Sequence, residues 1–416
     1  MTSLFIFKSK ERGMQYGMGT YVKNLTIGLL NTKEVIIFIV NYHSENYKEY
    51  TVETKSKKLV QIFIPSPKVI DIELKDEAKY VSKVVDLITY QINSSKSVVF
   101  LVNSPFSLPL VRQLKTKFNI PIISVVHSAI WQIVFNGNKK KFLEMWNHPE
   151  KFSPRTINLF NDEKEFYELS DKIVSVTNYM KHFIKSYYGL PENKILVVRN
   201  GIDVSKIKSS TPKEKYKLKK QLGFGPEERI ILFLGRLDAI KGIYYLLDSF
   251  NRVSKRNKNV RLVIIGEDTG VERISNYLSH CTNMWSRITF TGFLEHKVVE
   301  KFYKIAEIGV LPSVYDHCPY VAIEMMAHGI PLIISATDGL NEILSEDQSI
   351  YIKPLINNVG SISFDPNEIA DAILLLLKNN KKCHSIIKDY HGLIEKEFAL
   401  EKMANLMLSL MQNIAN

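Results

Sequence analysis

The stretch IILFLGRLDAIKG, residues 230–242, decides the fold. An apolar run of strand length enters a glycine-bearing turn that carries Arg236 and Lys241, and an amphipathic stretch, Ile243–Phe250, follows at once. A buried strand, a tight turn and a helix in this order form one half of a β-α-β unit. We therefore expect a parallel sheet whose functional loops follow its strands.

The same alternation extends over the whole chain. Its first unit is a strand at Leu4–Phe7, a glycine-bearing loop and a helix through Tyr21, Leu25 and Leu29. Further strands expected before residue 200 are Val35–Val40, Ser97–Leu101, Ile122–Val126, Lys172–Val176 and Ile195–Val198. Those expected after it are Ile230–Phe233, Arg261–Ile265, Ile288–Thr291, Ile308–Leu311 and Pro331–Ile334. This pattern predicts an α/β protein with two Rossmann-like doubly wound sheets.

A turn signal, Arg199-Asn200-Gly201-Ile202-Asp203, separates the two series and precedes a Lys/Ser-rich stretch that has little to bury. We expect an acceptor-binding domain over 1–201 and a donor-binding domain over 202–398, with a hinge at Asn200–Asp203. Apolar residues at helical spacing from Leu400 to Ile414 predict a closing helix within 399–416 that packs back on the first domain. Two facing sheets would place the ligand in an interdomain cleft.

The composition of the 416 residues, with 45% hydrophobic and 24% charged, is that of an ordinary globular protein. Three cysteines, Cys281, Cys318 and Cys383, are too far apart for a metal knuckle and indicate a reducing compartment. The N-terminus has no secretory hydrophobic region, and the uncharged window 120–138 is interpreted as a core strand entering a loop. A cytoplasmic location is expected.

The net charge of +12 is concentrated in the first half, where residues 1–200 carry 28 Lys and Arg against 18 Asp and Glu. Such an excess favours an anionic partner, either a lipid surface or a polyanionic substrate, although lysines that only solvate the surface are the alternative. Nucleic acid is disfavoured, because no RNP-type run or zinc-finger spacing occurs.

The loop Gly235–Gly242 places two cations before a helix N-terminus. Such a loop can hold a diphosphate between Arg236, Lys241 and the free N–H groups of the helix. The P-loop pattern GxxxxGK[ST] does not match, and a solvated loop without a ligand is the alternative.

A second glycine-bearing segment, Gly17-Met18-Gly19-Thr20-Tyr21, lies between the first strand and its helix. Glycines there let the backbone approach a phosphate closely. The segment lacks the third glycine of GxGxxG, which disfavours a nicotinamide site, and a tight turn without a ligand is the alternative.

Two carboxylates, Asp316 and Glu324, lie eight positions apart in PSVYDHCPYVAIE, residues 312–324. Asp316 follows a strand and Glu324 falls in the next helix, and each can accept hydrogen bonds from vicinal hydroxyls. A pair for glycoside hydrolysis is conceivable, but the adjacent cation pair favours a donor with a phosphate leaving group.

The segments GRLDAIKG, DHCPYVAIEMMAHGIPLI, RNGID and GMGTY together resemble the retaining GT-B glycosyltransferases of family 4, in the correct order along nearly the whole chain. The resemblance implies that Gly235, Arg236 and Lys241 grip the donor diphosphate and that Glu324 binds the nucleotide ribose. It implies that Asp316 contacts the transferred sugar. It also places Gly17, Gly19, His127, Pro319 and Tyr320 beside the donor, with Ala336–Gly339 and Glu342 near it. For His127, a core or capping role is the alternative.

The chain departs from the family pattern twice. Asp316 stands where the family has Glu, which shortens the reach by about 1.5 Å and is compatible with a different sugar or a weaker activity. Pro319 stands where many members have Gly, so one backbone N–H is missing.

The resemblance implies a transferase that moves a sugar from a UDP- or GDP-sugar to a hydroxyl acceptor, with retention by a front-face, SNi-like path. No DxD motif occurs, so we expect no metal and no further cofactor, the two cations replacing the metal. The acceptor, whether a glycan, a lipid-linked saccharide or a peptide, is expected on the first half, where we expect 131–168 to form elaborated loops and helices. A bacterial enzyme in peripheral contact with the inner face of an anionic membrane would suit the charge. A nucleotide-sugar epimerase, a phosphorylase and a silent nucleotide-binding homologue remain alternatives.

Overall fold

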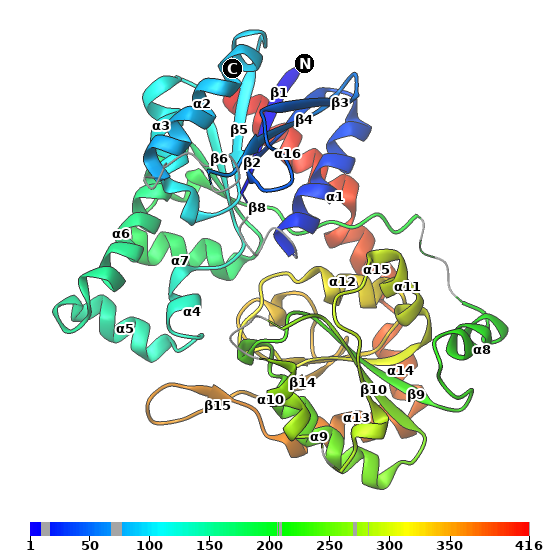
Figure 1. Cartoon of the computed structure of the whole chain (residues 1–416). Helices are drawn as coiled ribbons and strands as arrows, with labels where there is room; N and C mark the ends of the chain where they lie inside the picture. The colour runs from blue at the N-terminus through cyan, green and yellow to red at the C-terminus, as the bar shows by residue number, and fades with distance from the viewer. Residues whose placement is uncertain are drawn as a thin grey trace. The chain divides into compact units, whose positions relative to one another are not determined.

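The computed structural model describes residues 1–9, 17–67, 77–205, 207, 210–268, 273–281 and 283–415. The chain forms two compact units (Figure 1). The first consists of residues 1–130, 148–203 and 398–416, and the second of residues 131–147 and 204–397. Each unit has its own sheet and its own apolar core.

The sheet of the first unit has the strand order β3-β4-β2-β1-β5-β6-β7-β8 among the described residues. All neighbours in it pair in parallel except β3 and β4, which form an antiparallel edge. Its strands are β1 (Thr2–Lys8), β2 (Val35–Ser44), β3 (Thr51–Ser56), β4 (Leu59–Pro65), β5 (Val98–Val102), β6 (Ile122–Val126), β7 (Lys172–Ser175) and β8 (Ile195–Val197). The central strands β1, β5 and β6 are mostly apolar and are buried along nearly their whole length, because helices cover both faces of a doubly wound sheet.

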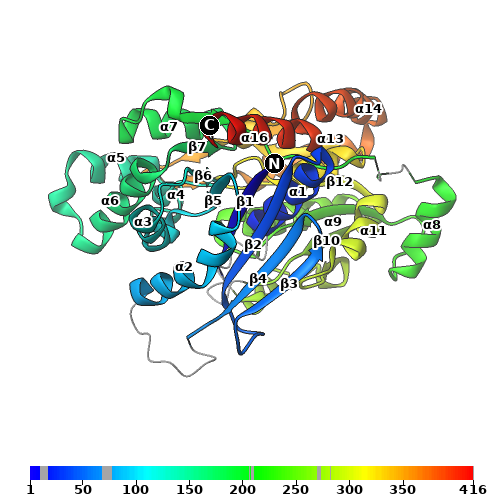
Figure 2. The same ribbon diagram turned by 90° about the horizontal axis from the view of Figure 1, so that it is seen from above.

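Helices connect these strands, as Figure 2 shows from above. They are α1 (Gly17–Thr32), α2 (Glu77–Asn93), α3 (Leu108–Lys117), α6 (Pro154–Leu169), α7 (Asn178–Tyr188) and α16 (Leu400–Ala415). The closing helix α16 packs against α1: a Cβ on Gly28 of α1 would lie 2.9 Å from Cβ of Ala404. Residues 398–416 thus complete the first unit, although they follow the second in sequence.

The sheet of the second unit has the order β11-β10-β9-β12-β13-β14 among the described residues, and every neighbouring pair is parallel. Its strands are β9 (Arg229–Leu234), β10 (Val260–Ile265), β11 (Ile288–Phe290), β12 (Ala306–Leu311), β13 (Leu332–Ser335) and β14 (Ile350–Ile352). A separate antiparallel hairpin joins β15 (Leu355–Ile356) to β16 (Ile362–Ser363).

The helices of the second unit include two that come from the first half of the sequence. These two are α4 (Ile130–Val134), which starts at the edge of the first unit, and α5 (Lys139–Asn147). The others are α8 (Pro212–Gln221), α9 (Ile243–Arg256), α10 (Ile274–Ser279), α11 (His296–Ile305), α12 (Tyr320–Ala327), α13 (Pro366–Lys378), α14 (Asn380–Ile387) and α15 (Tyr390–Leu393).

The fold prediction is confirmed, since both sheets are doubly wound and every strand expected from the sequence forms within a residue or a few of its expected ends. The prediction missed β3, β4, β14, β15 and β16. β3 is mostly polar and exposed, and β14, β15 and β16 have only two or three residues each, so these four carry no clear apolar period. β4, with the sequence LVQIFIP, does carry an apolar run of strand length, and the prediction overlooked it.

Residues 131–147 differ from the expectation. The predicted boundary near residue 202 places them in the first domain, whereas they pack with the second unit. Gly137 shows why: it has φ of 75°, and a Cβ there would lie 2.9 Å from Cγ1 of Val314. Such backbone contact with the loop after β12 has no periodic signature in sequence.

The segment around Gly201 is held within the first unit. Ile202 N–H donates to Phe398 O (2.9 Å), and Asn24 donates its side-chain amide to Gly201 O (3.0 Å). The chain leaves this unit after Asp203 and re-enters it at Phe398. Whether Asn200–Asp203 acts as a hinge stays a prediction.

The uncharged window 120–138 contains β6 and α4, as expected of a core strand entering a loop. Among the described residues, no helix combines the length and the apolar character that a bilayer crossing requires.

Candidate active site

The loop between β9 and α9 carries the two predicted cations. It begins at Gly235, and a short 3-10 turn, Ala239–Lys241, brings Lys241 to the start of α9. Gly242, the N-cap of α9, has φ of 69°, and a Cβ there would lie 2.0 Å from Pro312 O. Val314 N–H also donates to Ile240 O (2.7 Å). The loops that follow β9 and β12 are therefore fastened to each other at the carboxyl edge of the sheet.

Each cation has an acidic partner. Lys241 Nζ lies 2.6 Å from Asp316 Oδ2, with the two side chains 18% and 20% exposed. The Arg236 guanidinium lies 3.1 Å from Asp238 Oδ2. The structure thus brings together three of the predicted residues, Arg236, Lys241 and Asp316, around a fourth, Asp238, that sequence reasoning did not select.

The pKa of Asp238 is raised by its surroundings in this loop. Its burial raises its pKa above the ordinary value, and Asp316 adds to the rise, while Arg236 and Lys241 oppose it. Its Oδ1 atom is buried without a hydrogen-bond partner in the described part of the chain. The signal in the sequence is its place between Arg236 and Lys241, since a carboxylate flanked by two cations can hold them apart and neutralise them.

A third loop closes over Asp316. Gly339 has φ of 94°, and a Cβ there would lie 2.1 Å from Asp316 O and 2.6 Å from His317 Nδ1. Thr337 Oγ1 donates to Ser313 O (3.1 Å) from the same turn. The predicted segment Ala336–Gly339 therefore packs against the loop after β12 and stabilises it.

His317 anchors that loop to α4. Its Nε2 lies 2.8 Å from Gln132 Oε1, which can only accept, so the ring nitrogen donates. Both side chains are buried, and burial lowers the pKa of His317 to about 4. Burial likewise raises the pKa of the neighbouring Tyr315 phenol. No sequence motif indicates Gln132, because its partner lies 185 positions away.

Glu324 lies on α12, as predicted, with partners of its own. Tyr303 donates its hydroxyl to Oε2 (2.6 Å), and His296 Nε2 lies 3.3 Å from Oε1. Burial, followed by the charge of Glu324, raises the pKa of Tyr303 well above its ordinary value. Pro319 is the N-cap of this helix and Tyr320 its buried first residue. Tyr303 and His296 therefore orient the carboxylate, and neither of them belongs to the loop Gly235–Gly242 that carries the two cations.

The remaining predicted residues lie in the first unit. Gly17 and Gly19 occupy the first turn of α1, so the expectation of a loop at these positions is wrong; the preceding residues 10–16 lie outside the described part. A Cβ on Gly17 would meet nothing within 4 Å. His127 directly follows β6 and packs edge-on against Tyr21 of α1, with ring centroids 4.8 Å apart. The three residues thus mark the carboxyl edge of the first sheet.

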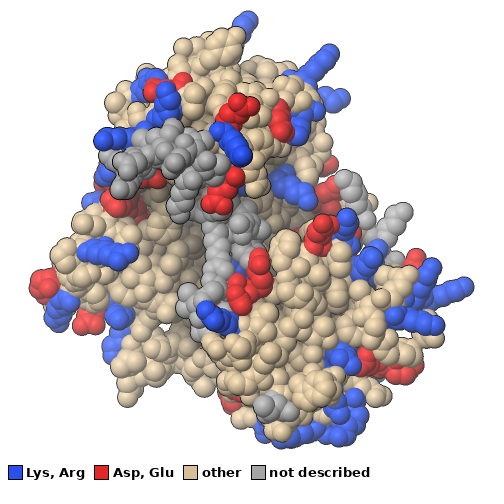
Figure 3. Space-filling view, in the orientation of Figure 1, with Lys and Arg blue, Asp and Glu red and all other residues tan. Residues whose placement is uncertain are grey.

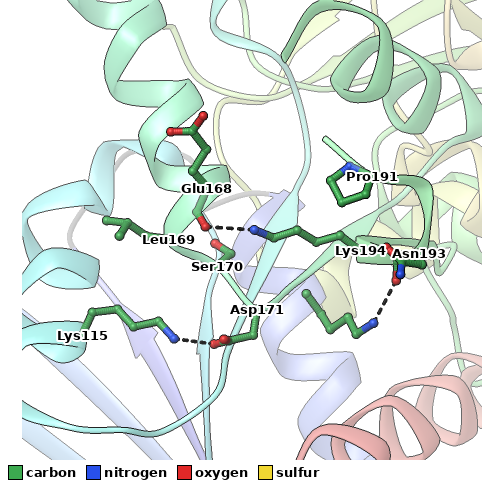
Figure 4. A pocket seen from close by; sticks show the side chains of 9 residues that line it. Lys115, Glu168, Leu169, Ser170, Asp171, Pro191, Asn193 and Lys194 are labelled. Atoms are coloured by element: carbon green, nitrogen blue, oxygen red, sulfur yellow. Dashed lines mark hydrogen bonds and ion pairs between the residues drawn. The ribbon is translucent and has the colours of Figure 1, made fainter. Parts of the chain in front are cut away.

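A surface hollow of about 520 Å³ in the first unit contains none of the predicted residues. Its three lysines are engaged. Figure 4 labels Lys115, which pairs with Asp171 (2.6 Å), and Lys194, which donates to Glu168 O (2.9 Å), and Lys172 donates to Asn193 O (2.8 Å). Lys172 starts β7 and Lys194 precedes β8, so the hollow lies at the amino edge of the sheet. Ligands of doubly wound sheets bind at the opposite edge.

Charged side chains are scattered over the face drawn in Figure 3, with acidic groups among the basic ones. Among the described residues, no group of three His, Cys, Asp or Glu side chains is arranged to hold a metal ion.

Two family models match the chain, one in each half. Residues 16–206 match Glycosyltransferase Family 4 and residues 214–390 match Glycosyl transferases group 1. An uncharacterised glycosyltransferase of Methanocaldococcus jannaschii is 28% identical over 59% of this chain and 65% of its own length. The mannosylfructose-phosphate synthase of Agrobacterium fabrum is 25% identical over 56% of this chain and 52% of its own length. The matched part thus spans less than two thirds of either relative.

Solved structures of similar fold cover nearly the whole chain. The sucrose-phosphate synthase of Thermosynechococcus elongatus has a TM-score of 0.78 at 19% identity, over 99% of both chains. Anabaena Alr3699/HepE in complex with UDP-glucose has a TM-score of 0.71 at 15% identity, over 99% of this chain and 100% of its own. At these identities the likeness concerns the GT-B fold alone. The two glycosyltransferase family models together cover residues 16–206 and 214–390, and the chain therefore belongs to the glycosyltransferases.

Proposed function

We propose that this chain transfers a sugar from a nucleotide-diphosphate sugar to a hydroxyl acceptor. The observation that carries the proposal is the pairing of Lys241 with Asp316 (2.6 Å), beside Arg236, where the loops after β9 and β12 are fastened together. A loop that holds two cations at a helix start is suited to a diphosphate, and a carboxylate beside it is suited to sugar hydroxyls.

The chemistry follows from these charges. Arg236 and Lys241 would neutralise the negative charge that builds on the departing diphosphate, which lowers the barrier to its departure. Asp316 and Asp238 hold the two cations in place while the site is free of donor. On donor binding, Lys241 would turn from Asp316 toward the phosphates, which leaves Asp316 available to the sugar.

The remaining assignments belong to the same proposal. Glu324 would accept hydrogen bonds from the ribose, and Gly235, Pro319 and Tyr320 would line the donor site from adjacent positions of the two loops. Gly17, Gly19 and His127, at the carboxyl edge of the first sheet, would act near the phosphate and the sugar ring. The domain roles, with the acceptor on residues 1–201 and the donor on 202–398, are likewise proposed.

For the donor we propose a UDP- or GDP-sugar. The presence of UDP-glucose in the crystal of Alr3699/HepE, a protein of the same fold, supports testing uridine nucleotides first. A thermal-shift panel of nucleoside diphosphates and nucleotide sugars reads out binding directly, because a ligand of the folded state raises the melting temperature as it saturates.

The decisive experiment measures transfer and donor affinity in Arg236→Ala and Lys241→Ala. Each change should slow transfer by about 10²–10³, the usual cost of losing one preorganised charge partner of a transition state. Lys255→Ala, at the exposed end of the same helix α9, is the matched control and should leave both quantities unchanged. Wild-type transfer by either loop variant would refute the proposal.

We further propose that the anomeric configuration is retained by a front-face, SNi-like departure and that no metal is needed. The guanidinium of Arg236 and the ammonium of Lys241 can together supply the charge stabilisation that a metal ion would give a diphosphate. NMR of the product anomer tests retention, and activity in excess chelator tests the metal requirement.

The alternatives differ in what they consume. A nucleotide-sugar epimerase converts the donor alone, a phosphorylase needs inorganic phosphate, and a silent homologue binds the nucleotide without turnover. NMR of the donor with and without acceptor and phosphate separates all three from a transferase. For the acceptor we propose a glycan, a lipid-linked saccharide or a peptide, with lipid-linked acceptors favoured by the basic first half.

A further inference from the structure

The hairpin β15–β16 exposes aliphatic side chains to solvent. Leu355, Ile356 and Val359 are 51%, 68% and 67% exposed. The segment PLINNVGSISF, residues 354–364, contains no charged residue. Figure 1 shows the hairpin, labelled β15, projecting from the rest of its unit. Side chains of this kind normally have a partner that covers them, because a cluster of exposed aliphatic groups costs free energy in water.

Helix α5 contacts this hairpin through one of its three lysines, Lys140, while Lys141 Nζ lies 5.8 Å from the centroid of the Phe135 ring. Helix α5 begins with Lys139, Lys140 and Lys141, all exposed, and carries a single acidic residue, Glu144. Lys140 Nζ donates to Asn358 O (2.6 Å), so its charge lies at the turn of the hairpin, next to Val359. Hairpin and lysines both belong to the second unit.

The contact between α5 and the hairpin is specific. Asn138 donates its side-chain amide to Val359 O (2.9 Å). Gly360 has φ of 86°, and a Cβ there would lie 2.5 Å from Asn138 Oδ1 and 2.6 Å from Cβ of Lys140. The turn therefore needs glycine in order to bring the aliphatic tip and the lysines together.

We propose that the hairpin and Lys139–Lys141 form a docking surface for an anionic lipid bilayer. Aliphatic side chains at the tip would enter the interfacial region, and the ammonium groups beside them would contact anionic headgroups. This goes beyond the transfer reaction and does not depend on it. We call residues 355–362 with Lys139–Lys141 the docking surface below.

Other partners fit the docking surface less well. A second copy of the chain related by a twofold axis would bring two lysine triplets together, and a hairpin that spans only residues 355–363 is far smaller than a standard dimer interface. Single-stranded nucleic acid would use aromatic side chains for stacking, whereas the exposed apolar groups of this hairpin are aliphatic.

The experiment is flotation of the full chain with vesicles of phosphatidylcholine, with and without phosphatidylglycerol. We expect binding to the anionic vesicles that is about a hundredfold stronger than to the zwitterionic ones, since each lysine at an anionic surface contributes about fivefold. High salt should remove most of this difference. Binding that is equal on both vesicle types, or absent from both, would overturn the proposal.

Two double variants separate the contributions. Ile356→Ser with Val359→Ser should weaken binding to anionic vesicles by at least about tenfold, because two apolar side chains no longer enter the interface. Lys139→Gln with Lys141→Gln should weaken it by about tenfold or more and reduce its salt dependence. Lys140 is kept, because it holds the hairpin.

Matched controls lie elsewhere on the same unit. Trp285→Ser removes another exposed apolar side chain, and Lys215→Gln with Lys217→Gln removes two exposed charges from α8. Both should bind as the wild type does. Equal losses in these controls, or unchanged binding in the hairpin variant, would overturn the assignment. Self-association in sedimentation velocity that Ile356→Ser abolishes would assign the surface to a second copy instead.

Discussion

Gln132 accepts a hydrogen bond from His317 over 2.8 Å, and both side chains are buried in the second unit. Gln132 comes from α4 in the first half of the sequence, whereas His317 adjoins Asp316 in the loop after β12. The bond thus fixes the proposed sugar-binding loop from a helix that precedes it by nearly half the chain.

Replacing Gln132 with Leu should destabilise the second unit by about 1–3 kcal/mol, because the buried N–H of His317 loses its acceptor. Equilibrium urea unfolding measures the change. Glu144→Gln, on the exposed face of the neighbouring helix α5, should remain within about 0.5 kcal/mol of wild type. An equally small change in Gln132→Leu would mean that the bond is not formed in solution.

Most of this architecture follows from the sequence, for a physical reason. The strand at Ile230–Phe233 and the loop with Arg236 and Lys241 are local features, so an apolar run followed by glycine and charge predicts them directly. Partners distant in sequence leave no such pattern. The bond from Gln132 to His317 joins two side chains 185 positions apart, and residues 131–147 pack with the second unit through contacts such as that of Gly137 with Val314. A single sequence displays neither.

His317 should make the free energy of unfolding depend on pH. Its pKa is lowered from 6.5 to about 4 by burial, so the folded chain disfavours the proton that the unfolded chain accepts. Asp316 partly offsets this effect and Lys241 adds to it. The contribution of His317 is therefore present above pH 6.5 and is lost as the pH falls toward 4, by about 1.4 kcal/mol per unit.

His317→Gln isolates this effect, since Gln keeps a donor for Gln132 but does not titrate. As the pH falls from 7 to 4, the free energy of unfolding of the variant should rise by about 3 kcal/mol relative to that of the wild type. Urea unfolding over that range provides the test. Parallel curves for the two proteins would show that the ring is not buried as a neutral group.

Glu163 should act in the opposite direction. It accepts hydrogen bonds from Ile130 N–H (3.1 Å), Tyr167 (2.9 Å) and Tyr188 (2.5 Å), and burial raises its pKa from 4.5 to about 7. The folded chain therefore binds a proton that the unfolded chain has released. Its contribution is largest below pH 4.5 and is lost as the pH rises through 7.

As the pH rises from 4.5 to 8, the free energy of unfolding of Glu163→Gln should increase by about 3 kcal/mol relative to that of the wild type. The reason is that the amide keeps hydrogen-bond partners for both tyrosines but does not ionise. Exposed Glu168→Gln, on the same helix α6, should show no such gain. A wild-type pH profile in Glu163→Gln would place the carboxyl in a more polar environment than the structure has it.

The ion pair of Asp316 with Lys241 predicts a divergence between binding and transfer. Asp316→Asn removes the carboxylate that holds Lys241, so a nucleoside diphosphate should bind several-fold tighter, since the ammonium is released and a like charge is gone. Transfer should become slower, because the proposed contact to the sugar is lost. Calorimetry with UDP and GDP, alongside an activity assay, measures both.

Asp248→Asn on the exposed face of α9 serves as the control for that experiment and should change neither quantity. A parallel loss of nucleotide affinity and transfer in Asp316→Asn would mean that Asp316 supports the phosphates and does not compete with them.

Gly242 and Gly329 form a natural pair for testing the fastening of the two loops. Their φ angles are 69° and 67°, so alanine at either position costs about 1–2 kcal/mol of backbone strain. A Cβ at Gly242 would overlap Pro312 O at 2.0 Å, whereas one at Gly329 would meet nothing within 4 Å. Gly242→Ala should therefore lose about 1–3 kcal/mol more than Gly329→Ala in urea unfolding. It should also weaken nucleotide binding, because the clash displaces the start of α9 and with it Lys241 from the position proposed for the diphosphate contact, while Gly329→Ala should bind as wild type does. Equal effects of the two variants on stability and affinity would show that the loops after β9 and β12 are not held together.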